Sequence, residues 1–372
     1  MPELALLGGK KSKSKPFPQW PQFDENERRA LNEVLESGIW WRTPGTKTLE
    51  FESAFARFHG ARHGIAVTNG TAALEVAMAS LPVGPGDEVI VPNFTFIATA
   101  SAVLFANALP VLVDVRPDTY CLDPQLAEAA ITSRTKAIIA VHMGGHPADL
   151  DALKALAARN KIALIEDCAH AHASEWKGQR VGTFGVAGTF SFQASKLMTA
   201  GEGGIIISND NGFARQARSI HDCGRIPDEW FYSHFIYGSN YRLSEWQGAM
   251  LMAQLQRLDE QTRTRHQNAR WLDRELAMIP GISPQKFDQR CTRNAQYAYI
   301  FYVDHKQFAG TSTESFIAAM NAEGIPNQAS YPPLHELEIF RSGEYRKRLS
   351  GVQATAEHTF LRQSFPHTQR AA

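Results

Sequence analysis

Residues 137–165 read AIIAVHMGGHPADLDALKALAARNKIALI, and this stretch decides the fold. Two short apolar runs, at 137–141 and 163–165, stand on either side of a segment of helical length at 149–159. Short runs that stay apolar, without alternating polar residues, are typical of strands buried on both faces. The order strand, helix, strand predicts an α/β sheet.

The same alternation continues in both directions. Further strand-like runs occur at 64–67, 88–91, 111–115, 187–192 and 204–207. Helices are expected at 25–37, 48–58, 72–80, 95–106 and 124–130. A long helix expected at 244–276 could link two domains. We therefore predict an N-terminal arm (1–24), a large α/β domain (25–262) and a smaller α+β domain (263–372).

Composition narrows the class of protein. Lys+Arg and Asp+Glu both number 38 in 372 residues, which excludes a general electrostatic attraction to nucleic acid or to anionic membranes. There is no apolar run of about 18 residues, so no membrane span is expected, and the first residues do not resemble a signal peptide. The four cysteines are scattered without a C-x-x-C pair. We expect a cytoplasmic protein without disulfides.

Two segments at strand ends suit ligand binding. In residues 67–74, VTNGTAAL, a strand meets a glycine turn, and a helix begins near Thr71. Free N–H groups there would bind an anion, although Thr71 could simply cap the helix. Residues 166–172 read EDCAHAH after a strand, which places an acid at its carboxyl end. Cys168, His170 and His172 match no common zinc spacing, and we expect no metal.

A third segment surrounds a lysine. Residues 190–204, FSFQASKLMTAGEGG, place Lys196 between a strand and a glycine-rich turn. Apolar neighbours would lower the pKa of Lys196 by desolvation, and a lysine that can lose its proton suits Schiff-base chemistry. A fourth segment, residues 238–244, is polar and opens the long helix, so it could be only a helix cap.

Together, the order and spacing of these segments resemble the DegT-type sugar and cyclitol aminotransferases. The resemblance runs from about residue 20 to about residue 361. It is carried by the motifs at 37–40, 86–90, 95–96, 114–123, 142–149, 166–170, 190–204 and 238–242. It implies the aspartate-aminotransferase-like fold of enzymes that use pyridoxal 5'-phosphate (PLP), with a mostly parallel seven-stranded sheet and a smaller α+β domain. The family normally continues past Ala372, so the small domain looks shortened.

The resemblance assigns catalytic roles to two residues. Lys196 would be the Schiff-base lysine and would later shuttle a proton. Asp167 would pair with the pyridinium nitrogen, which lets the ring accept electrons. His170 would lie near the oxygen substituent of the ring, and Phe96 would stack on it.

The remaining cofactor contacts concern the phosphate. Gly70, Thr71, Ala72 and Ser191 would bind it within one subunit. Asn240 would reach the phosphate of the neighbouring subunit's cofactor, so the resemblance implies a homodimer with shared active sites.

Two narrower matches bear on the substrate. Trp40-Trp41-Arg42 and the segment around Lys196 look like the 3-amino-5-hydroxybenzoate synthases, whereas residues 118–126 look like the glutamine-dependent scyllo-inosose aminotransferases. Trp41, Arg42, Tyr331 and His335 are the candidate substrate contacts, since aromatic faces and polar groups suit a polyhydroxylated ring. Trp40 and Trp41 could instead be core or interface residues.

The expected reaction moves an amino group from glutamate or glutamine to a keto-sugar or cyclitol ketone in amino-sugar, aminocyclitol or related secondary metabolism. Two alternatives stay open. One is a synthase-like PLP enzyme with dehydratase or lyase activity. The other is a non-enzymatic protein that kept the fold, against which the intact Lys196 and Asp167 argue.

Overall fold

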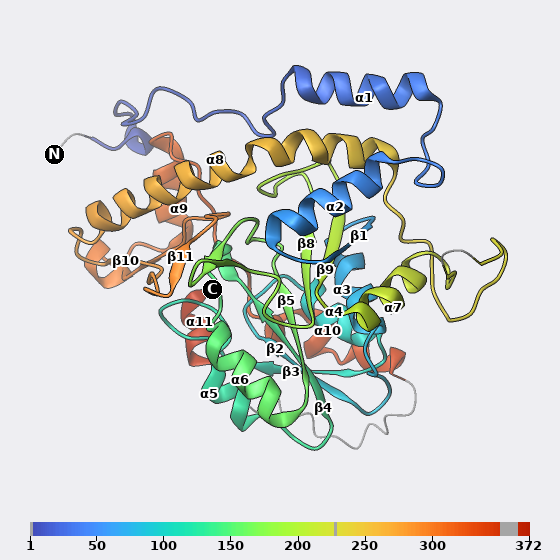
Figure 1. The fold of residues 1–372 in the computed structure, drawn as a ribbon. Helices are drawn as coiled ribbons and strands as arrows, with labels where there is room; N and C mark the ends of the chain where they lie inside the picture. Colours follow the sequence, from blue (N-terminus) through green and yellow to red (C-terminus); the bar gives the residue numbers. More distant parts are fainter. Residues whose placement is uncertain (1–2, 227–228, 350–363) are drawn as a thin grey trace.

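A central sheet organises the molecule. The computed structural model describes residues 3–226, 229–349 and 364–372, and within them seven strands form one sheet in the order β1-β9-β8-β5-β4-β2-β3 (Figure 1). The strands are β1 (His63–Val67), β2 (Glu88–Pro92), β3 (Leu109–Val113), β4 (Thr135–Val141), β5 (Ala163–Asp167), β8 (Ala187–Ser191) and β9 (Gly204–Ser208). Strands β3, β2, β4, β5 and β8 run parallel. Strand β9 pairs antiparallel with both β8 and β1, so it alone of the seven strands runs in the opposite direction. The predicted mostly parallel sheet is confirmed.

Each predicted apolar run corresponds to one of these strands, with one shift. The run predicted at 111–115 is observed as Leu109–Val113, because β3 pairs with β2 from Leu109 opposite Glu88. The strand ends before Asp114, whose side chain accepts hydrogen bonds from the C-terminal segment. Strands such as β2, β4 and β9 are buried on both faces, which explains why they read as continuous apolar runs in the sequence.

The helices follow recognisable end signals. They are α1 (Glu25–Ser37), α2 (Lys47–His59), α3 (Gly70–Ala79), α4 (Ala98–Phe105), α5 (Pro124–Ala129), α6 (Leu150–Asn160), α7 (Asn211–His221), α8 (Glu245–Leu276), α9 (Thr313–Ala322), α10 (Glu338–Arg341) and α11 (Pro366–Ala371). Helix α1 begins with a capping box between Asp24 and Glu27 and ends at Gly38 in a left-handed conformation, as glycine readily allows. No helix of the described ranges is long and apolar enough to cross a membrane.

Helix α8 runs without a break through the predicted domain boundary at 262–263. Beyond it, β10 (Ile282–Pro284) and β12 (Phe301–Val303) form a small sheet beside α9 (Figure 1). Strand β11 (Cys291–Arg293) instead pairs with β6 (Glu175–Trp176), which also pairs with β7 (Gln179–Arg180). The chain thus returns to the large part of the molecule after α8, and the proposed division at 262 stays a prediction.

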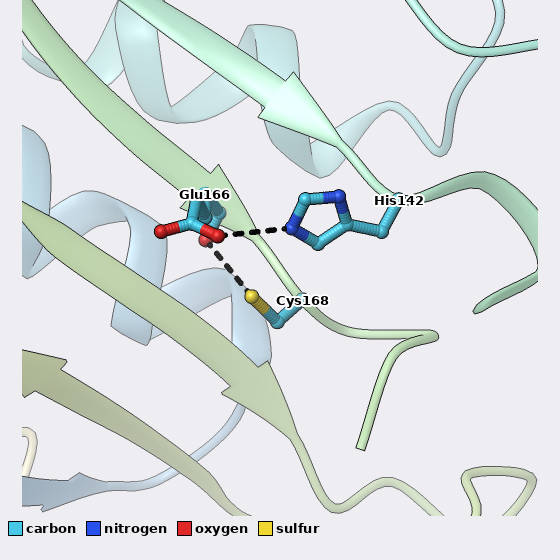
Figure 2. Close-up of side chains that lie close together, drawn as sticks. All are labelled: His142, Glu166 and Cys168. Atoms are coloured by element: carbon cyan, nitrogen blue, oxygen red, sulfur yellow. Dashed lines mark hydrogen bonds and ion pairs between the residues drawn. The ribbon is translucent and has the colours of Figure 1, made fainter. Parts of the chain in front are cut away.

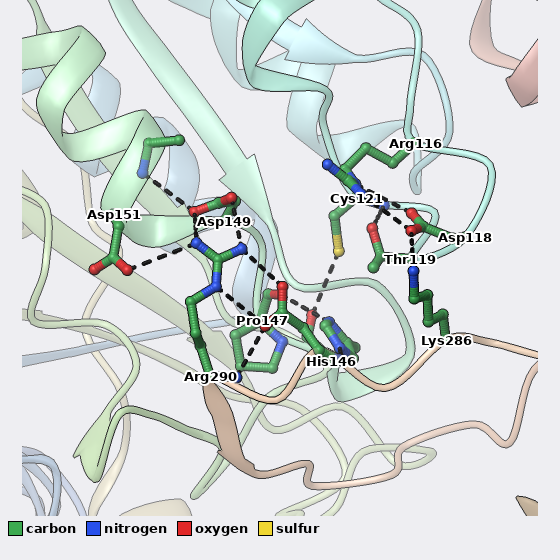
Figure 3. A network of polar contacts seen from close by, with 12 residues as sticks. Arg116, Asp118, Thr119, Cys121, His146, Pro147, Asp149, Asp151, Lys286 and Arg290 are labelled. Carbon is green, nitrogen blue, oxygen red and sulfur yellow. Dashed lines mark hydrogen bonds and ion pairs between the residues drawn. The ribbon is translucent and has the colours of Figure 1, made fainter.

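An ion-pair network fastens this returning segment (Figure 3). The Arg290 guanidinium donates to both carboxylate oxygens of Asp149, at 3.0 and 2.8 Å, and also pairs with Asp288. The Lys286 N–H donates to the Asp118 carbonyl at 2.7 Å. A few residues later, the Tyr297 N–H donates to the Gly144 carbonyl, which holds the Tyr297 side chain over the carboxyl ends of the strands.

The last described segment packs against the end of β3. The Asp114 carboxylate accepts hydrogen bonds from the His367 and Thr368 N–H groups at 3.0 and 2.7 Å. The Phe365 ring is buried and lies 4.6 Å from the His335 ring. Residue 361, where the resemblance ends, lies outside the described residues.

Candidate active site

A cavity of about 670 Å³ lies at the carboxyl ends of the parallel strands. Val141, Asp167 and Ser191, at the ends of β4, β5 and β8, all line it. This is where open α/β sheets bind ligands. The structure brings together these residues with predicted roles: Gly70, Thr71, Ala72, Phe96, Asp167, His170, Ser191, Lys196 and Tyr331.

Lys196 stands in a tight turn that follows β8. Its N–H donates to the Gln193 carbonyl at 2.8 Å, and its Nζ lies 4.5 Å from the centre of the Tyr297 ring. Burial lowers the pKa of Lys196 to about 8, and the nearby Asp167 carboxylate opposes this shift. The predicted desolvation is therefore confirmed, and a useful share of this amine is uncharged near neutral pH.

Asp167 ends β5 and is buried. Burial raises the pKa of its carboxyl group, while hydrogen bonds from the Ala169 N–H and the Thr99 hydroxyl, and the positive charge of Lys196, pull the pKa down. The two hydrogen bonds measure 3.1 and 2.9 Å. This carboxylate is positioned to hold a proton or a positive charge on a ligand in the cavity.

The N-terminus of α3 forms the anion-binding corner of the cavity. Asn69 caps the helix, because its side chain accepts the Ala72 N–H at 2.8 Å, so the alternative that Thr71 is the cap is wrong. The Gly70 and Thr71 N–H groups in the first turn have no partner within their own helix. A side chain at Gly70 would clash, since its Cβ would lie 2.5 Å from Ser191 Cβ. The backbone and the Ser191 side chain thus approach closely and leave a cradle.

His170 lies between two tyrosine rings. Its ring centre is 4.1 Å from that of Tyr297 and 6.0 Å from that of Tyr331, and both pairs are stacked. Burial, reinforced by Lys196 and His172, lowers the pKa of His170 well below its usual value, so the imidazole is neutral. Within the described part of the chain, its Nδ1 is buried without a hydrogen-bond partner. A buried polar atom without a partner beside a cavity suits a ligand that would satisfy it.

Four predicted residues do not line the cavity of their own chain: Trp41, Arg42, Asn240 and His335. The Trp41 ring is exposed and meets the Phe231 ring edge-on at 6.0 Å. The Asn240 side chain is exposed and accepts the Arg242 N–H at 3.4 Å. His335 bonds Asn93 at 2.8 Å and packs against Phe365.

The prediction that Arg42 contacts the substrate is corrected by its surroundings. Its guanidinium is 7% exposed and forms two hydrogen bonds, of 2.5 and 3.0 Å, with the Glu52 carboxylate. Glu52 also pairs with Arg218 at 3.2 Å and accepts the Ala66 N–H. Arg42 is therefore committed to an internal ion pair and is not free to bind a substrate carboxylate. The sequence could not reveal this, because aromatic neighbours made the residue resemble a pocket residue.

A second cluster of possible ligand atoms lies beside the cavity, in His142, Glu166 and Cys168 (Figure 2). His142 Nδ1 accepts the Ala148 N–H, so its Nε2 carries the proton and donates to Glu166 at 3.3 Å. Burial and two nearby carboxylates raise the pKa of the Cys168 thiol, which stays protonated. Because these atoms are used in internal hydrogen bonds, the cluster ties β5 to its surroundings and does not have the character of a metal site.

Several cavity residues had no predicted role. Tyr297 is the clearest case, because it contacts both Lys196 and His170, and its hydroxyl bonds Ser195 at 2.9 Å. The sequence places it about a hundred residues beyond Lys196 in a weakly patterned region, so only the fold reveals it. Others include Glu75, Thr95, Gln193, Glu202 and Tyr241.

Comparison with known proteins identifies the family. The model of the DegT/DnrJ/EryC1/StrS aminotransferase family matches residues 21–371. The chain belongs to this family. The predicted family, fold class and enzyme class are therefore confirmed.

Individual relatives agree over most of their length. A 3-amino-5-hydroxybenzoate synthase of Amycolatopsis mediterranei is 44% identical over 333 residues, which cover 88% of this chain and 84% of the relative. An L-glutamine:2-deoxy-scyllo-inosose aminotransferase of Micromonospora echinospora is 42% identical over 365 residues, which cover 94% and 86%. A crystal structure of 3-amino-5-hydroxybenzoic acid synthase superposes with a TM-score of 0.87 at 40% identity, covering 96% of this chain and 91% of that chain.

Proposed function

We propose that this aminotransferase uses PLP and moves an amino group from glutamate or glutamine to a keto-sugar or cyclitol ketone, in the biosynthesis of an amino sugar, an aminocyclitol or a related secondary metabolite. The observation that carries the proposal is the pairing, in one cavity, of a lysine whose pKa is lowered to about 8 with a buried carboxylate. The glutamine:scyllo-inosose aminotransferases among its relatives support the donor and the acceptor class.

The cavity fits this cofactor in size and in chemistry. Its volume lies within the range of pockets for small ligands. The α3 N-terminus with Ser191 offers donors to a phosphate, and the unpartnered Nδ1 of His170 offers a bond to a ring substituent. Phe96, which is 54% exposed and lines the cavity, offers a ring face.

When bound, PLP supplies an electron sink and carries the amino group between the two substrates. Lys196 would hold the cofactor covalently through Nζ and, once displaced, would move a proton to and from the substrate carbon. Asp167 would hold the proton on the ring nitrogen. Tyr297, under Lys196 Nζ, would limit where this amine can move.

We also propose a homodimer with shared sites. Asn240 is exposed and absent from its own cavity, which supports a role in a neighbouring subunit's site. Exposed aromatic residues of the segment at 230–237, including Trp230 (71%) and Tyr232 (66%), support a surface that another copy covers. A cytoplasmic location stays a prediction that the free cysteines support.

The second candidate is a synthase-like enzyme that also eliminates water, which the 44% identity to 3-amino-5-hydroxybenzoate synthase favours. Such a product carries a carboxylate, and Arg42 is the cation among the candidate substrate contacts that could pair with it. Its commitment to Glu52 removes that support. Simple amino transfer to a neutral ketone therefore stands first.

Two measurements test the proposal. Purified protein is loaded with PLP, reduced with borohydride and mapped by peptide mass, and the label should be on Lys196. Label on another lysine, or no label, would refute PLP use at this site. The same protein, incubated with glutamine or glutamate and a panel of keto-sugars and cyclitol ketones, should give products whose mass reports amino transfer, with loss of one further water marking the second candidate.

A further inference from the structure

Two hydrogen bonds hold the Asp167 carboxylate. One comes from helix α4, outside the cavity, and the other comes from the backbone just after β5. The Thr99 hydroxyl, in the first turn of α4, donates to Asp167 Oδ2 at 2.9 Å. The Ala169 N–H donates to Oδ1 at 3.1 Å. Thr99 is fully buried and does not line the cavity, so it contacts the carboxylate from behind.

A second threonine fixes the direction of this hydrogen bond. Thr95 Oγ1 lies 3.1 Å from Thr99 Oγ1, and Thr95 is also buried. An ionised carboxylate can only accept, so the one hydroxyl proton of Thr99 goes to Asp167. Thr99 must then accept its other bond, which Thr95 donates. The order Thr95 to Thr99 to Asp167 is a directed chain in which each donor strengthens the next.

We propose that Thr99 is a positioning residue for Asp167, and that Thr95 orients the Thr99 hydroxyl. This inference rests on the proposed function, since it concerns the state in which Asp167 meets the cofactor ring. The Thr99 bond keeps the carboxylate ionised despite its burial and fixes one oxygen, which leaves the other side of the group directed at the cavity. The same turn connects Phe96, the residue proposed to face the cofactor ring, to these hydrogen bonds, because the Thr99 N–H donates to the Phe96 carbonyl at 3.2 Å.

The test separates positioning from simple packing. Thr99→Val keeps the shape of the side chain and removes the hydroxyl, and Thr99→Ser restores a hydroxyl. Thr95→Val removes the outer bond, and because Thr95 also lines the cavity, PLP loading and KM are measured for this variant beside kcat. Thr135→Val is the matched control, because Thr135 is also a buried threonine, at the opposite end of β4, and its hydroxyl oxygen accepts a hydrogen bond from the Thr132 N–H. Each holoenzyme is reconstituted with PLP labelled with ¹⁵N in the ring, and the nitrogen resonance is recorded beside kcat and KM.

In the wild type the resonance should be that of a protonated ring. In Thr99→Val, loss of a donor makes the Asp167 carboxylate more basic, so the proton shared with the ring nitrogen should move toward the carboxylate. The nitrogen resonance should then move toward the unprotonated value, and kcat should fall by roughly ten- to a hundredfold with little change in KM. Thr95→Val should shift both in the same direction by less, and Thr99→Ser should lie close to wild type. Thr135→Val should lower stability alone.

An unchanged nitrogen resonance in Thr99→Val, with kcat lowered no more than in Thr135→Val, would overturn the positioning role and leave the proposed function intact. If Thr99→Val does not fold, a wild-type resonance and kcat in Thr95→Val would overturn it. If the wild-type protein fails to hold PLP on Lys196, the borohydride experiment shows that first, and both proposals fall together.

Discussion

The titration of Lys196 tests the site without any cofactor. Its pKa is lowered from 10.5 to about 8, with burial as the main cause. At pH 7 an amine of ordinary pKa is about 0.03% neutral, whereas one of pKa about 8 is about 10% neutral, a gain of roughly 300-fold in reactive amine. The Asp167 carboxylate raises the Lys196 pKa, so Asp167→Asn should move the titration further down.

Competitive labelling measures this directly. The apoenzyme is treated with trace acetic anhydride at a series of pH values from about 6 to about 11, and the acetylated peptides are quantified by mass spectrometry. The exposed Lys154 serves as the internal reference. Lys196 should titrate near pH 8, and the Asp167→Asn protein should titrate lower. A Lys196 midpoint near pH 10.5, or an upward shift in the variant, would refute the conclusion that burial lowers the pKa of Lys196 and that Asp167 raises it.

Other outcomes follow from the same geometry. Asp167→Asn should still bind PLP but lose about a hundredfold or more in kcat, because an amide does not hold the ring's positive charge; near wild-type turnover would make Asp167 only a structural cap. Mixing Lys196→Ala with Asn240→Ala subunits should restore one complete site per dimer, and verified heterodimers without activity would place Asn240 in its own subunit's site. Arg42→Ala should cost about 3–5 kcal/mol of unfolding free energy in urea titrations, because it breaks a buried ion pair; unchanged stability with a selective loss of the acceptor half-reaction would return Arg42 to the substrate. Burial lowers the pKa of His59 from 6.5 to about 3, so its contribution to stability is present above pH 6.5 and is lost as the pH falls toward 3. The unfolding free energy should therefore fall by up to about 1.4 kcal/mol per pH unit below pH 6.5 from this residue, and His59→Phe should flatten the slope by that amount.

The sheet was predictable because its strands carry their own signal. A strand buried on both faces is apolar throughout, and the helices between such strands end at caps and glycines that the sequence displays. Strands β6, β7 and β11 are two or three residues long and polar in part, so no local pattern marks them. They exist because the segment after α8 returns to the large part of the molecule, which is a long-range event.

The site was predictable where spacing along one strand end or turn fixes it, and not where partners come from distant segments. Lys196 and Asp167 each follow a strand, and the cavity brings both together. Arg42 was misjudged because its partner, Glu52, lies ten residues away on α2, and nothing local shows that the two side chains meet. Thr99 was missed because a threonine inside an apolar helix is ordinarily only a packing residue.

The neighbouring acids Glu166 and Asp167 show why the structure is needed to assign such roles. Side chains alternate along a strand, so two adjacent acids at the end of β5 must face opposite sides. Glu166 accepts four hydrogen bonds, from His142 and from the N–H groups of the turn at 182–185. A carboxylate has about four lone-pair positions, so Glu166 has no capacity left for a ligand. Asp167 lines the cavity and accepts two hydrogen bonds from the protein. It therefore has lone pairs left to accept a hydrogen bond from a protonated ring nitrogen. Of two acids that the sequence presents side by side, access to the cavity and free hydrogen-bonding capacity together select Asp167 as the one that can serve the chemistry.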